Sequence, residues 1–337
     1  MMNISEFAQI AGVSKSAVSR YFNDGYLSED KRERIEAAIA QTGYAPNIAA
    51  RAVRTRVTKL VGVILPKLSS ESCARVTEGI SEVLNREGYK ILLINTANDA
   101  HQEIESLELL RQNRVDGIIL LATVFTDLHK SVLSKVRVPI VLVGQQLKGF
   151  NCICHNDEEV AYTLTRRMLQ NGAKHPALIG VLQEDRAAGA ARRAGFEKAL
   201  EEFGMTCDPR MMETAQFTMD SGYDCMRRIV SRRQIPDAVF CATDDIAAGA
   251  MLCLRENGLR VPEDVMVCGV GDSKIARILY TPLTTARLHH KTAGIEAANM
   301  LLSAIRSKSV VPRSLQLGYD VIERQSTQQT ELKYETV

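Results

Sequence analysis

Several features that mark membrane, secreted and redox-active proteins are missing from this 337-residue sequence. No apolar run approaches the roughly 20 residues that a membrane-spanning helix needs. The N-terminus has no basic stretch followed by an apolar one, so we expect no secretory signal peptide. The 8 cysteines form no Cys-x-x-Cys pair and no spacing typical of a metal site. These absences predict a cytoplasmic protein with reduced, buried thiols.

Catalytic and cofactor motifs are missing as well. The sequence has no Gly-x-Gly-x-x-Gly fingerprint and no phosphate-binding P-loop. His175, His289 and His290 have no Ser or Cys nucleophile elbow to match them. The adjacent Asp244 and Asp245 suit the lining of a sugar site, where carboxylates accept hydrogen bonds from hydroxyls, better than acid–base catalysis. We therefore expect no enzyme, no cofactor and no metal site.

The composition is that of an ordinary globular protein. Hydrophobic residues make up 45% and charged residues 24%, and the length allows two or three domains. The net charge of +2 is unevenly distributed. Residues 1–59 carry nine Lys or Arg and six Asp or Glu, a net of +3, while the remainder has a net of −1. This excess of positive charge points to a polyanionic partner at the N-terminus.

Two kinds of pattern divide the chain. Residues 1–57 predict short helices without strands, and from residue 60 compact apolar runs alternate with amphipathic stretches. The runs expected to be strands are 60–65, 91–94, 118–121, 140–143, 177–182, 238–242 and 265–270. Apolar strands separated by helices indicate parallel sheets covered on both faces, and their number exceeds what one sheet usually carries. We therefore predict a small all-α headpiece and an α/β core of two doubly wound parallel-sheet lobes.

Residues 1–45 have the pattern of a helix-turn-helix. Asn3 and Glu6 fit a capping box, Gly12 breaks the first helix, and Ser14 can cap a second helix over residues 15–22. A third helix is expected after Ser28. The second helix of such a motif enters the major groove, where Lys15, Ser16 and Arg20 could reach base edges. On charge alone, a solvated helix in an ordinary bundle is an equally good interpretation.

Residues 3–55 resemble the headpiece of the lac/gal repressor family. The resemblance is carried by Gly12-Val13-Ser14, Val18-Ser19-Arg20, Gly43-Tyr44-x-Pro46-Asn47 and Ala50-Arg51. It implies DNA contacts from the second helix and from a hinge helix that follows the third helix. The residues expected to make these contacts are Lys15, Ser16, Ser19, Arg20, Asn23, Tyr44, Asn47, Arg51, Val53 and Arg54.

Residues 46–59 correspond to the family's hinge helix and linker. In the family this helix orders on operator DNA, enters the minor groove from both subunits and inserts a leucine between base steps. Val53 stands at the matching position in this chain. The smaller side chain affects the depth of the DNA kink but not the mode of binding. Arg51 and Arg54 flank Val53 and can reach phosphates or the groove.

Residues 60–325 resemble the family's sugar-binding core, whose two lobes are similar to periplasmic binding proteins. The matching stretches are Val115-Asp116-Gly117-Ile118, Arg192-Arg193-Ala194-Gly195-Phe196, Thr243-Asp244-Asp245 and Pro282-Leu283-Thr284-Thr285. The resemblance implies a dimer in which a ligand between the lobes changes the lobe angle and hence the spacing of the headpieces. Residues 326–337 are polar and are expected to be a frayed tail.

Ligands of parallel α/β sheets bind beyond the carboxyl ends of the strands. The residues expected to contact an effector there are Lys67, Ser69, Ser70, Arg192, Asp244, Asp245 and Asp272. The resemblance implies effector contact by Arg192, and it shows Lys67 and Gly271 at positions where relatives often carry an acid. These charges favour a phosphorylated sugar. The alternatives are a neutral sugar with Lys67 solvated, and an Asp244 that only caps the following helix.

Details of the core also resemble two branches of the family, the trehalose-operon and sucrose-operon repressors. These details are Lys148-Gly149-Phe150, Ala242-Thr243-Asp244 and Gly269-Val270-Gly271. We predict a homodimeric repressor of carbohydrate-utilisation genes that binds pseudo-palindromic operator DNA and a sugar or sugar-phosphate effector. The alternatives are a regulator controlled by a protein corepressor and, less well supported, a plain sugar-binding protein. No leucine heptads follow residue 325, so a coiled-coil tetramer is not expected.

Overall fold

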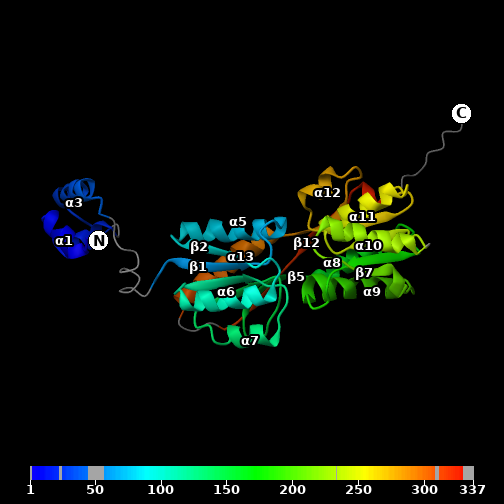
Figure 1. The fold of residues 1–337 in the computed structure, drawn as a ribbon, viewed down its shortest axis with the longest axis horizontal. Coiled ribbons are helices and arrows are strands. Elements are labelled where there is room, and N and C mark those ends of the chain that lie inside the picture. Colours follow the sequence, from blue (N-terminus) through cyan, green and yellow to red (C-terminus); the bar gives the residue numbers. More distant parts are fainter. Residues whose placement is uncertain (1, 23–24, 45–56, 233, 308–310, 329–337) are drawn as a thin grey trace. The chain divides into compact units, whose positions relative to one another are not determined.

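A computed structural model describes residues 2–22, 25–44, 57–232, 234–307 and 311–328 (Figure 1). The chain divides into two compact units, Met1–Lys59 and Leu60–Val337. Among the described residues, none of the helices combines the length and the apolar character needed to cross a bilayer. All eight cysteines are free thiols, and only the Cys207 side chain is partly exposed.

The first unit contains α1 (Ile4–Ile10), α2 (Lys15–Tyr21) and α3 (Glu29–Thr42). Both predicted N-terminal caps are present. Asn3 Oδ1 accepts hydrogen bonds from the backbone N–H groups of Ser5 and Glu6, and the Glu6 carboxylate accepts one from the Asn3 N–H. The Ser14 hydroxyl accepts from the Ala17 N–H at 3.2 Å. The three helices enclose a small core of Phe7, Ala8, Ala11, Val18, Ile35 and Ala38.

The second unit consists of two lobes, each built on a six-stranded sheet. Lobe 1 has the strand order β11-β5-β4-β3-β1-β2, and every neighbouring pair is parallel. Its strands are β1 (Leu60–Leu65), β2 (Lys90–Asn95), β3 (Gly117–Leu121), β4 (Ile140–Val143), β5 (Asn151–His155) and β11 (Ser314–Leu317). Its helices are α5 (Glu71–Arg86), α6 (Ala100–Gln112), α7 (Asp127–Leu133) and α13 (His290–Arg306).

Lobe 2 has the strand order β12-β10-β9-β8-β6-β7, and its edge strand β12 runs antiparallel to β10. Its strands are β6 (Pro176–Gly180), β7 (Met212–Thr214), β8 (Ala238–Cys241), β9 (Met266–Val270), β10 (Thr284–Leu288) and β12 (Tyr319–Ile322). Its helices are α8 (Asp157–Gln170), α9 (Arg192–Glu202), α10 (Met219–Ser231), α11 (Asp244–Glu256) and α12 (Lys274–Ile278). A π-helical turn over Arg186–Ala191 precedes α9, and short 3-10 turns span Pro209–Met211 and Gln325–Thr327.

The predicted two-lobed fold is confirmed, and all seven expected strands are present within two residues of their predicted bounds. The sequence did not predict β5, β7, β10, β11 and β12. Three of these are edge strands of their sheets, and β5 and β10 contain buried polar residues that resemble loop residues in sequence. The expectation of wholly parallel sheets is wrong for β12, which follows β11 after Gly318 without an intervening helix and pairs antiparallel with β10.

The chain crosses between the lobes three times, from β5 to α8, from β10 to α13 and from β11 to β12. The late elements α13 and β11 therefore complete lobe 1, and Figure 1 shows orange α13 beside cyan α5. These two helices approach closely through glycines. A Cβ on Gly79 would lie 2.1 Å from the Lys291 carbonyl oxygen, and a Cβ on Gly294 would lie 2.0 Å from that of Val76.

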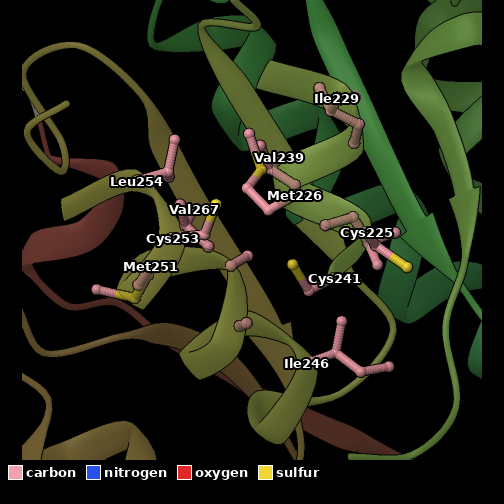
Figure 2. Packing of buried hydrophobic residues seen from close by; sticks show 14 of the residues in the cluster. Cys225, Met226, Ile229, Val239, Cys241, Ile246, Met251, Cys253, Leu254 and Val267 are labelled. Carbon is pink, nitrogen blue, oxygen red and sulfur yellow. The ribbon is translucent and has the colours of Figure 1, made fainter. Parts of the chain in front are cut away.

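Apolar clusters cover both faces of each sheet. Figure 2 shows the cluster between the lobe 2 sheet and helices α10 and α11, where Met226, Val239, Cys241 and Ile246 are fully buried. Two residues at the end of the described chain also belong to this lobe. The Ser326 hydroxyl donates to the Val267 carbonyl at 2.6 Å, and Ser326 and Thr327 are buried. The expected fraying from residue 326 is therefore wrong for these two residues, and 329–337 lie outside the described residues.

Candidate functional site: the second helix and the interlobe cleft

The second helix of the headpiece presents a polar face beyond the turn that follows α1. Gly12 has a φ of +63°, in the left-handed region that favours glycine, and its position permits the sharp turn between α1 and α2. Lys15, Ser16 and Arg20 are exposed, and Ser19 is half-buried. No carboxylate of the described residues forms an ion pair with Lys15 or Arg20. The geometry of α2 therefore suits contact with a polyanion.

The other expected DNA contacts are placed differently or lie outside the described residues. The Tyr44 ring stacks on Phe7, with ring centroids 4.1 Å apart and planes 13° apart, so it contributes to the headpiece core. Tyr44 is half-buried, so the exposed part of its ring remains available for a DNA contact. The residues that fall outside the described part of the chain are Asn23, Asn47, Arg51, Val53 and Arg54.

A cavity of about 390 Å³ lies between the two lobes of the core. It is lined by residues at or just after the carboxyl ends of β1, β4, β8 and β9 and by the starts of α5 and α11, as expected for parallel sheets. Of the seven residues predicted to contact an effector, six line this cavity: Lys67, Ser69, Ser70, Arg192, Asp244 and Asp245. Asp272 is not among the lining residues.

Arg192 is held by partners on both sides. Its Nε and Nη2 atoms donate to one oxygen of Asp157, at 2.8 and 2.7 Å, and Nη1 donates to the Ala242 carbonyl. Arg192 and Asp157 are 8% and 6% exposed, so this is a buried ion pair. Because Asp157 neutralises the guanidinium, Arg192 offers N–H donors to a ligand but little excess charge.

Asp244 lies on the cleft wall and is anchored within lobe 2. Its Oδ1 accepts from the Thr285 hydroxyl at 2.6 Å and its Oδ2 from the Ser273 N–H at 2.7 Å. Burial raises the pKa of this carboxyl, and the bonds from Thr285 and Ser273 oppose the rise. Thr243, rather than Asp244, caps α11 by accepting from the Ile246 N–H. The helix-capping alternative for Asp244 is therefore wrong.

The backbone conformation at Gly271 accounts for the lack of an acid at this position, beside Asp244. The Gly271 φ of +140° is a conformation that L side chains rarely adopt, and a Cβ would lie 3.3 Å from Asp244 Oδ2. A carboxylate at this position would also face the charge of Asp244. The backbone conformation therefore favours glycine here.

Asp272 serves lobe 2 instead of the cleft, which corrects the expectation from sequence. Its carboxylate is buried and accepts from Arg324 at 2.5 Å, Arg287 at 2.8 Å and Arg277 at 3.0 Å. Burial acts to raise the pKa of Asp272, but the three guanidinium groups outweigh it and lower the pKa to about 2. The φ of Asp272 is +44°, a backbone conformation that residues other than glycine rarely adopt.

Lys67 and the start of α5 form the wall of the cleft in lobe 1. The Lys67 ammonium donates to the Phe217 carbonyl of lobe 2 at 3.1 Å, so it is not a solvated loop residue. Ser70 caps α5 by accepting from the Cys73 N–H at 3.4 Å. Gln145 makes a second contact between the lobes, donating to Asp185 at 2.7 Å.

Two histidines, His155 and His290, also line the cleft. His155 and His290 stand at two of the crossovers, with ring centroids 5.3 Å apart. Burial lowers the pKa of His155 to about 4, with Arg192 and His289 adding to the shift and Asp157 opposing it. Burial, aided by His155 and Arg192, lowers the pKa of His290 to about 3. His155 Nε2 is buried without a hydrogen-bond partner among the described residues.

The charged side chains that line the cleft include more acids than bases. The bases are Lys67, Arg75 and Arg192, and the acids are Glu71, Asp157, Asp185, Asp244 and Asp245. Two of the bases are paired with acids, Arg75 with Glu71 and Arg192 with Asp157. The charge argument for a phosphorylated effector therefore rests on Lys67. The described part of the chain brings together no cluster of His, Cys, Asp and Glu that could hold a metal ion.

A helix-turn-helix unit with an exposed polar second helix, attached to a two-lobed core with a polar cleft, defines a DNA-binding regulator with an effector domain. Comparisons with known proteins agree. Residues 3–47 match the family described as "Bacterial regulatory proteins, lacI family", and residues 58–325 match "Periplasmic binding proteins and sugar binding domain of LacI family". The chain belongs to the LacI family of transcriptional regulators, which are not enzymes.

Curated relatives match almost the whole chain. The HTH-type transcriptional regulator RegA of Clostridium saccharobutylicum is 32% identical over 328 residues, covering 96% of this chain and 99% of that protein. The HTH-type transcriptional repressor PurR of Haemophilus influenzae (strain PittEE) is 32% identical over 313 residues, covering 91% and 92%. These relatives do not test the trehalose- or sucrose-operon branch, which stays a prediction.

Solved structures are similar over the same length. The transcriptional regulator CelR–cellobiose complex has a TM-score of 0.75 and 28% sequence identity, covering 97% of this chain and 100% of that one. The lac repressor dimer bound to operator and the anti-inducer ONPF has a TM-score of 0.87 and 23% identity, covering 97% and 99%. At this lower identity the lac repressor shows the shared fold alone.

Proposed function

We propose that the protein is a homodimeric repressor of carbohydrate-utilisation genes whose operator affinity is set by a sugar or sugar phosphate in the interlobe cleft. The observation that carries this proposal is the cleft, because six of the residues predicted to bind an effector line one cavity between two lobes. A ligand that contacts both lobes can bind one lobe arrangement more tightly than another and so shift their populations. Such a regulator acts on chromosomal DNA, so we place it in the cytoplasm.

The chemistry of the cleft favours a ligand rich in hydroxyls. Asp244 and Asp245 can accept hydrogen bonds from hydroxyl groups, and Ser69, Ser70 and Arg192 can donate to hydroxyl oxygens. The relative CelR was solved with cellobiose, a carbohydrate. We assign these residues and Lys67 to effector binding.

In the headpiece, we assign base contacts to Lys15, Ser16, Ser19 and Arg20, which lie toward the exposed side of α2. The segment 46–59 would link this unit to the core, with Asn47, Arg51 and Arg54 contacting the DNA backbone and Val53 inserted between base steps. A larger wedge should deepen the kink. Val53→Leu should therefore tighten operator binding and increase DNA bending, and unchanged affinity and bending would remove Val53 from this role.

Exposed apolar side chains of the core support the homodimer. Leu92 and Leu93 are 41% and 40% exposed on β2, which lies at the edge of its sheet. Leu68, whose N–H donates to Asn95 at the end of β2, is 60% exposed. In lobe 2, Ile278 is 80% exposed and is the last residue of α12. Apolar groups at a sheet edge favour association, and a second copy of the chain would cover them. A two-fold dimer pairs two headpieces with two half-sites.

The test is selection of binding sites from random DNA followed by footprinting with the purified full chain. We expect a pseudo-palindromic site protected over both halves. The matched control is the double variant Lys15→Ala/Arg20→Ala, which leaves the core unchanged and should lose the selected site. A single asymmetric half-site occupied by a monomer would contradict the dimeric repressor.

The effector is tested by thermal unfolding of the full chain in a panel of sugars and sugar phosphates. A ligand that binds the folded state raises the unfolding temperature as its concentration exceeds its dissociation constant. We expect a stabilising sugar to change operator affinity in the same assay. An operator response that needs a second protein and no sugar would favour the protein-corepressor alternative instead.

A further inference from the structure

The start of α5 in lobe 1 and the turn before α12 in lobe 2 are joined across the cleft. The Arg75 guanidinium donates to the Asp272 carbonyl at 3.1 Å and to the Gly271 carbonyl at 3.4 Å. Glu71 Oε2 accepts from the Lys274 N–H at 3.0 Å. One acid and one base of α5 therefore make three polar contacts with residues 271, 272 and 274 of one turn in the other lobe.

The two side chains of α5 are fixed by each other. Glu71 and Arg75 are one helical turn apart, and Arg75 Nη2 lies 2.5 Å from Glu71 Oε1. Glu71 thus uses one carboxylate oxygen for Arg75 and the other for the Lys274 N–H. Both side chains are about 30% exposed, at 28% for Arg75 and 30% for Glu71, so water screens the contacts less than at a free surface. Because Glu71 and Arg75 neutralise each other, α5 brings no net charge from this pair to the contact.

The receiving turn is held firmly within lobe 2. The Asp272 carboxylate is bound by Arg277, Arg287 and Arg324, and the Ser273 N–H donates to Asp244. The carbonyl groups that meet Arg75 are therefore presented by a segment with little freedom to follow α5 if the lobes separate. Lobe opening must break the contacts instead of carrying the turn along.

The contacts are made by residues other than those of the three segments by which the chain crosses between the lobes, around residues 155–157, 288–290 and 317–319. These crossovers are covalent and act as the hinge of any lobe rotation. Glu71 and Arg75 also line the cleft, together with Gly271. A ligand in the cleft therefore meets the same groups that join the lobes.

From this arrangement we infer that Glu71 and Arg75 form a clamp that holds the lobes closed and is coupled to the binding of an effector in the same cleft. The role of this clamp in regulation rests on the proposed function, whereas its effect on lobe closure does not. Because the clamp and the ligand use the same cleft, the free energy of one is coupled to that of the other. Glu71 and Arg75 thus contribute to the balance between closed and open cores, beside the contacts of Lys67 and Gln145.

The clamp is tested on the purified full chain without added sugar, by amide hydrogen exchange of the variants Arg75→Ala, Glu71→Ala and Glu71→Gln. Exchange of peptides covering residues 271–276 should become about fivefold faster or more in both alanine variants, because the Lys274 N–H and its turn lose their partners. Glu71→Gln retains an acceptor for Lys274 but loses its charge for Arg75, so we expect an intermediate rate. The matched control is Arg86→Ala on the same helix, which removes an exposed pair with Glu82 within lobe 1 and should leave these peptides unchanged.

A second measurement separates lobe opening from a local loss of contact. The sequence has no tryptophan, so Phe217→Trp introduces a single fluorophore into the cleft wall. Adding Arg75→Ala to this variant should shift the emission to longer wavelength and raise acrylamide quenching about twofold, while adding Arg86→Ala should do neither. Circular dichroism confirms that each variant is folded. Unchanged exchange in both alanine variants, or faster exchange with unchanged tryptophan quenching, would overturn the clamp. Since neither measurement uses DNA, its failure is distinct from failure of the proposed repressor.

Discussion

Arg192 and Asp157 form the most buried ion pair of the cleft, with two guanidinium nitrogens 2.8 and 2.7 Å from a single carboxylate oxygen. Asp157 begins α8, directly after the first crossover, and Arg192 begins α9, after the π-helical turn. The pair therefore joins the start of α9 to the start of α8, where the chain enters lobe 2 from lobe 1. Its position suggests that it fixes the shape of the cleft floor before any ligand binds.

Loss of Asp157 should be costly. Asp157→Asn leaves the Arg192 charge buried without its counterion, and breaking a buried pair in this way costs about 3–5 kcal/mol. We expect urea unfolding at neutral pH to show a loss of this order in the free energy of unfolding. The control is Arg193→Ala, which removes the neighbouring exposed pair with Glu197 and should change stability by less than about 1 kcal/mol. If the two variants lost equal stability, the buried pair would have no special role.

The two cleft histidines predict an acid-dependent loss of stability. The pKa values of His155 and His290 are lowered to about 4 and about 3, whereas an unfolded histidine titrates near 6.5. Below pH 6.5 the unfolded chain therefore binds protons that the folded chain does not. The free energy of unfolding should fall as the pH drops from about 6.5 toward 4, by at most about 1.4 kcal/mol per pH unit for each imidazole.

This slope is measured by urea unfolding at several pH values. His155→Gln and His290→Gln should each make the dependence between pH 6.5 and 4.5 shallower than in the wild type. His101→Gln is the control, since His101 is on the surface of α6 with 76% of its side chain exposed. A slope that is the same in all three variants would show that the buried imidazoles are not responsible.

Local signals in the sequence were sufficient for the headpiece. The Asn3–Glu6 capping box and the Ser14 cap specify where α1 and α2 begin, and these interactions involve residues at most three positions apart. The apolar strands of the lobes were predicted for a similar reason, because continuous burial makes them apolar over their whole length. The caps and strands that were predicted correctly are therefore determined by residues close to one another in the chain.

The missed parts depend on distant partners. Thr284 and Thr285 of β10 look like loop residues in sequence, but their hydroxyls bond Thr327 and Asp244 inside lobe 2. Asp272 was expected in the cleft because it follows β9, but its carboxylate is bound by Arg287 of β10 and by Arg324, which follows β12. His290 enters the cleft because α13 returns to lobe 1, which no local pattern indicates.

Arg20 should discriminate the operator from other DNA. It is exposed on α2, on the side where base contacts are proposed, and a good base contact contributes roughly 1–3 kcal/mol to specific binding. Arg20→Ala should weaken binding to the selected operator by that amount and binding to random DNA by less, as measured by fluorescence anisotropy at fixed salt. Lys31→Ala removes an exposed charge from the supporting helix α3 and serves as the control. Equal losses on both DNAs would make Arg20 a phosphate contact.

A phosphorylated sugar should bind the cleft more tightly than the same sugar without its phosphate. The reason is Lys67, whose ammonium lines the cleft and whose described partner is the neutral carbonyl of Phe217, not a carboxylate. A phosphate can replace this carbonyl and gain a charge-assisted hydrogen bond, which is roughly twice as strong as a neutral one. The five acids of the lining oppose a dianion, so the gain depends on the phosphate lying at the Lys67 end.

Calorimetry with pairs of ligands, each sugar against its 6-phosphate, measures this preference directly. We expect the phosphorylated form to bind about tenfold more tightly to the wild type, and Lys67→Ala to remove most of that difference while changing the affinity for the free sugar little. Lys135→Ala makes the same change in net charge at an exposed position outside the cleft lining and should retain the preference. Equal affinity for both forms, with Lys67→Ala silent, would instead indicate a neutral sugar recognised by the carboxylates of Asp244 and Asp245.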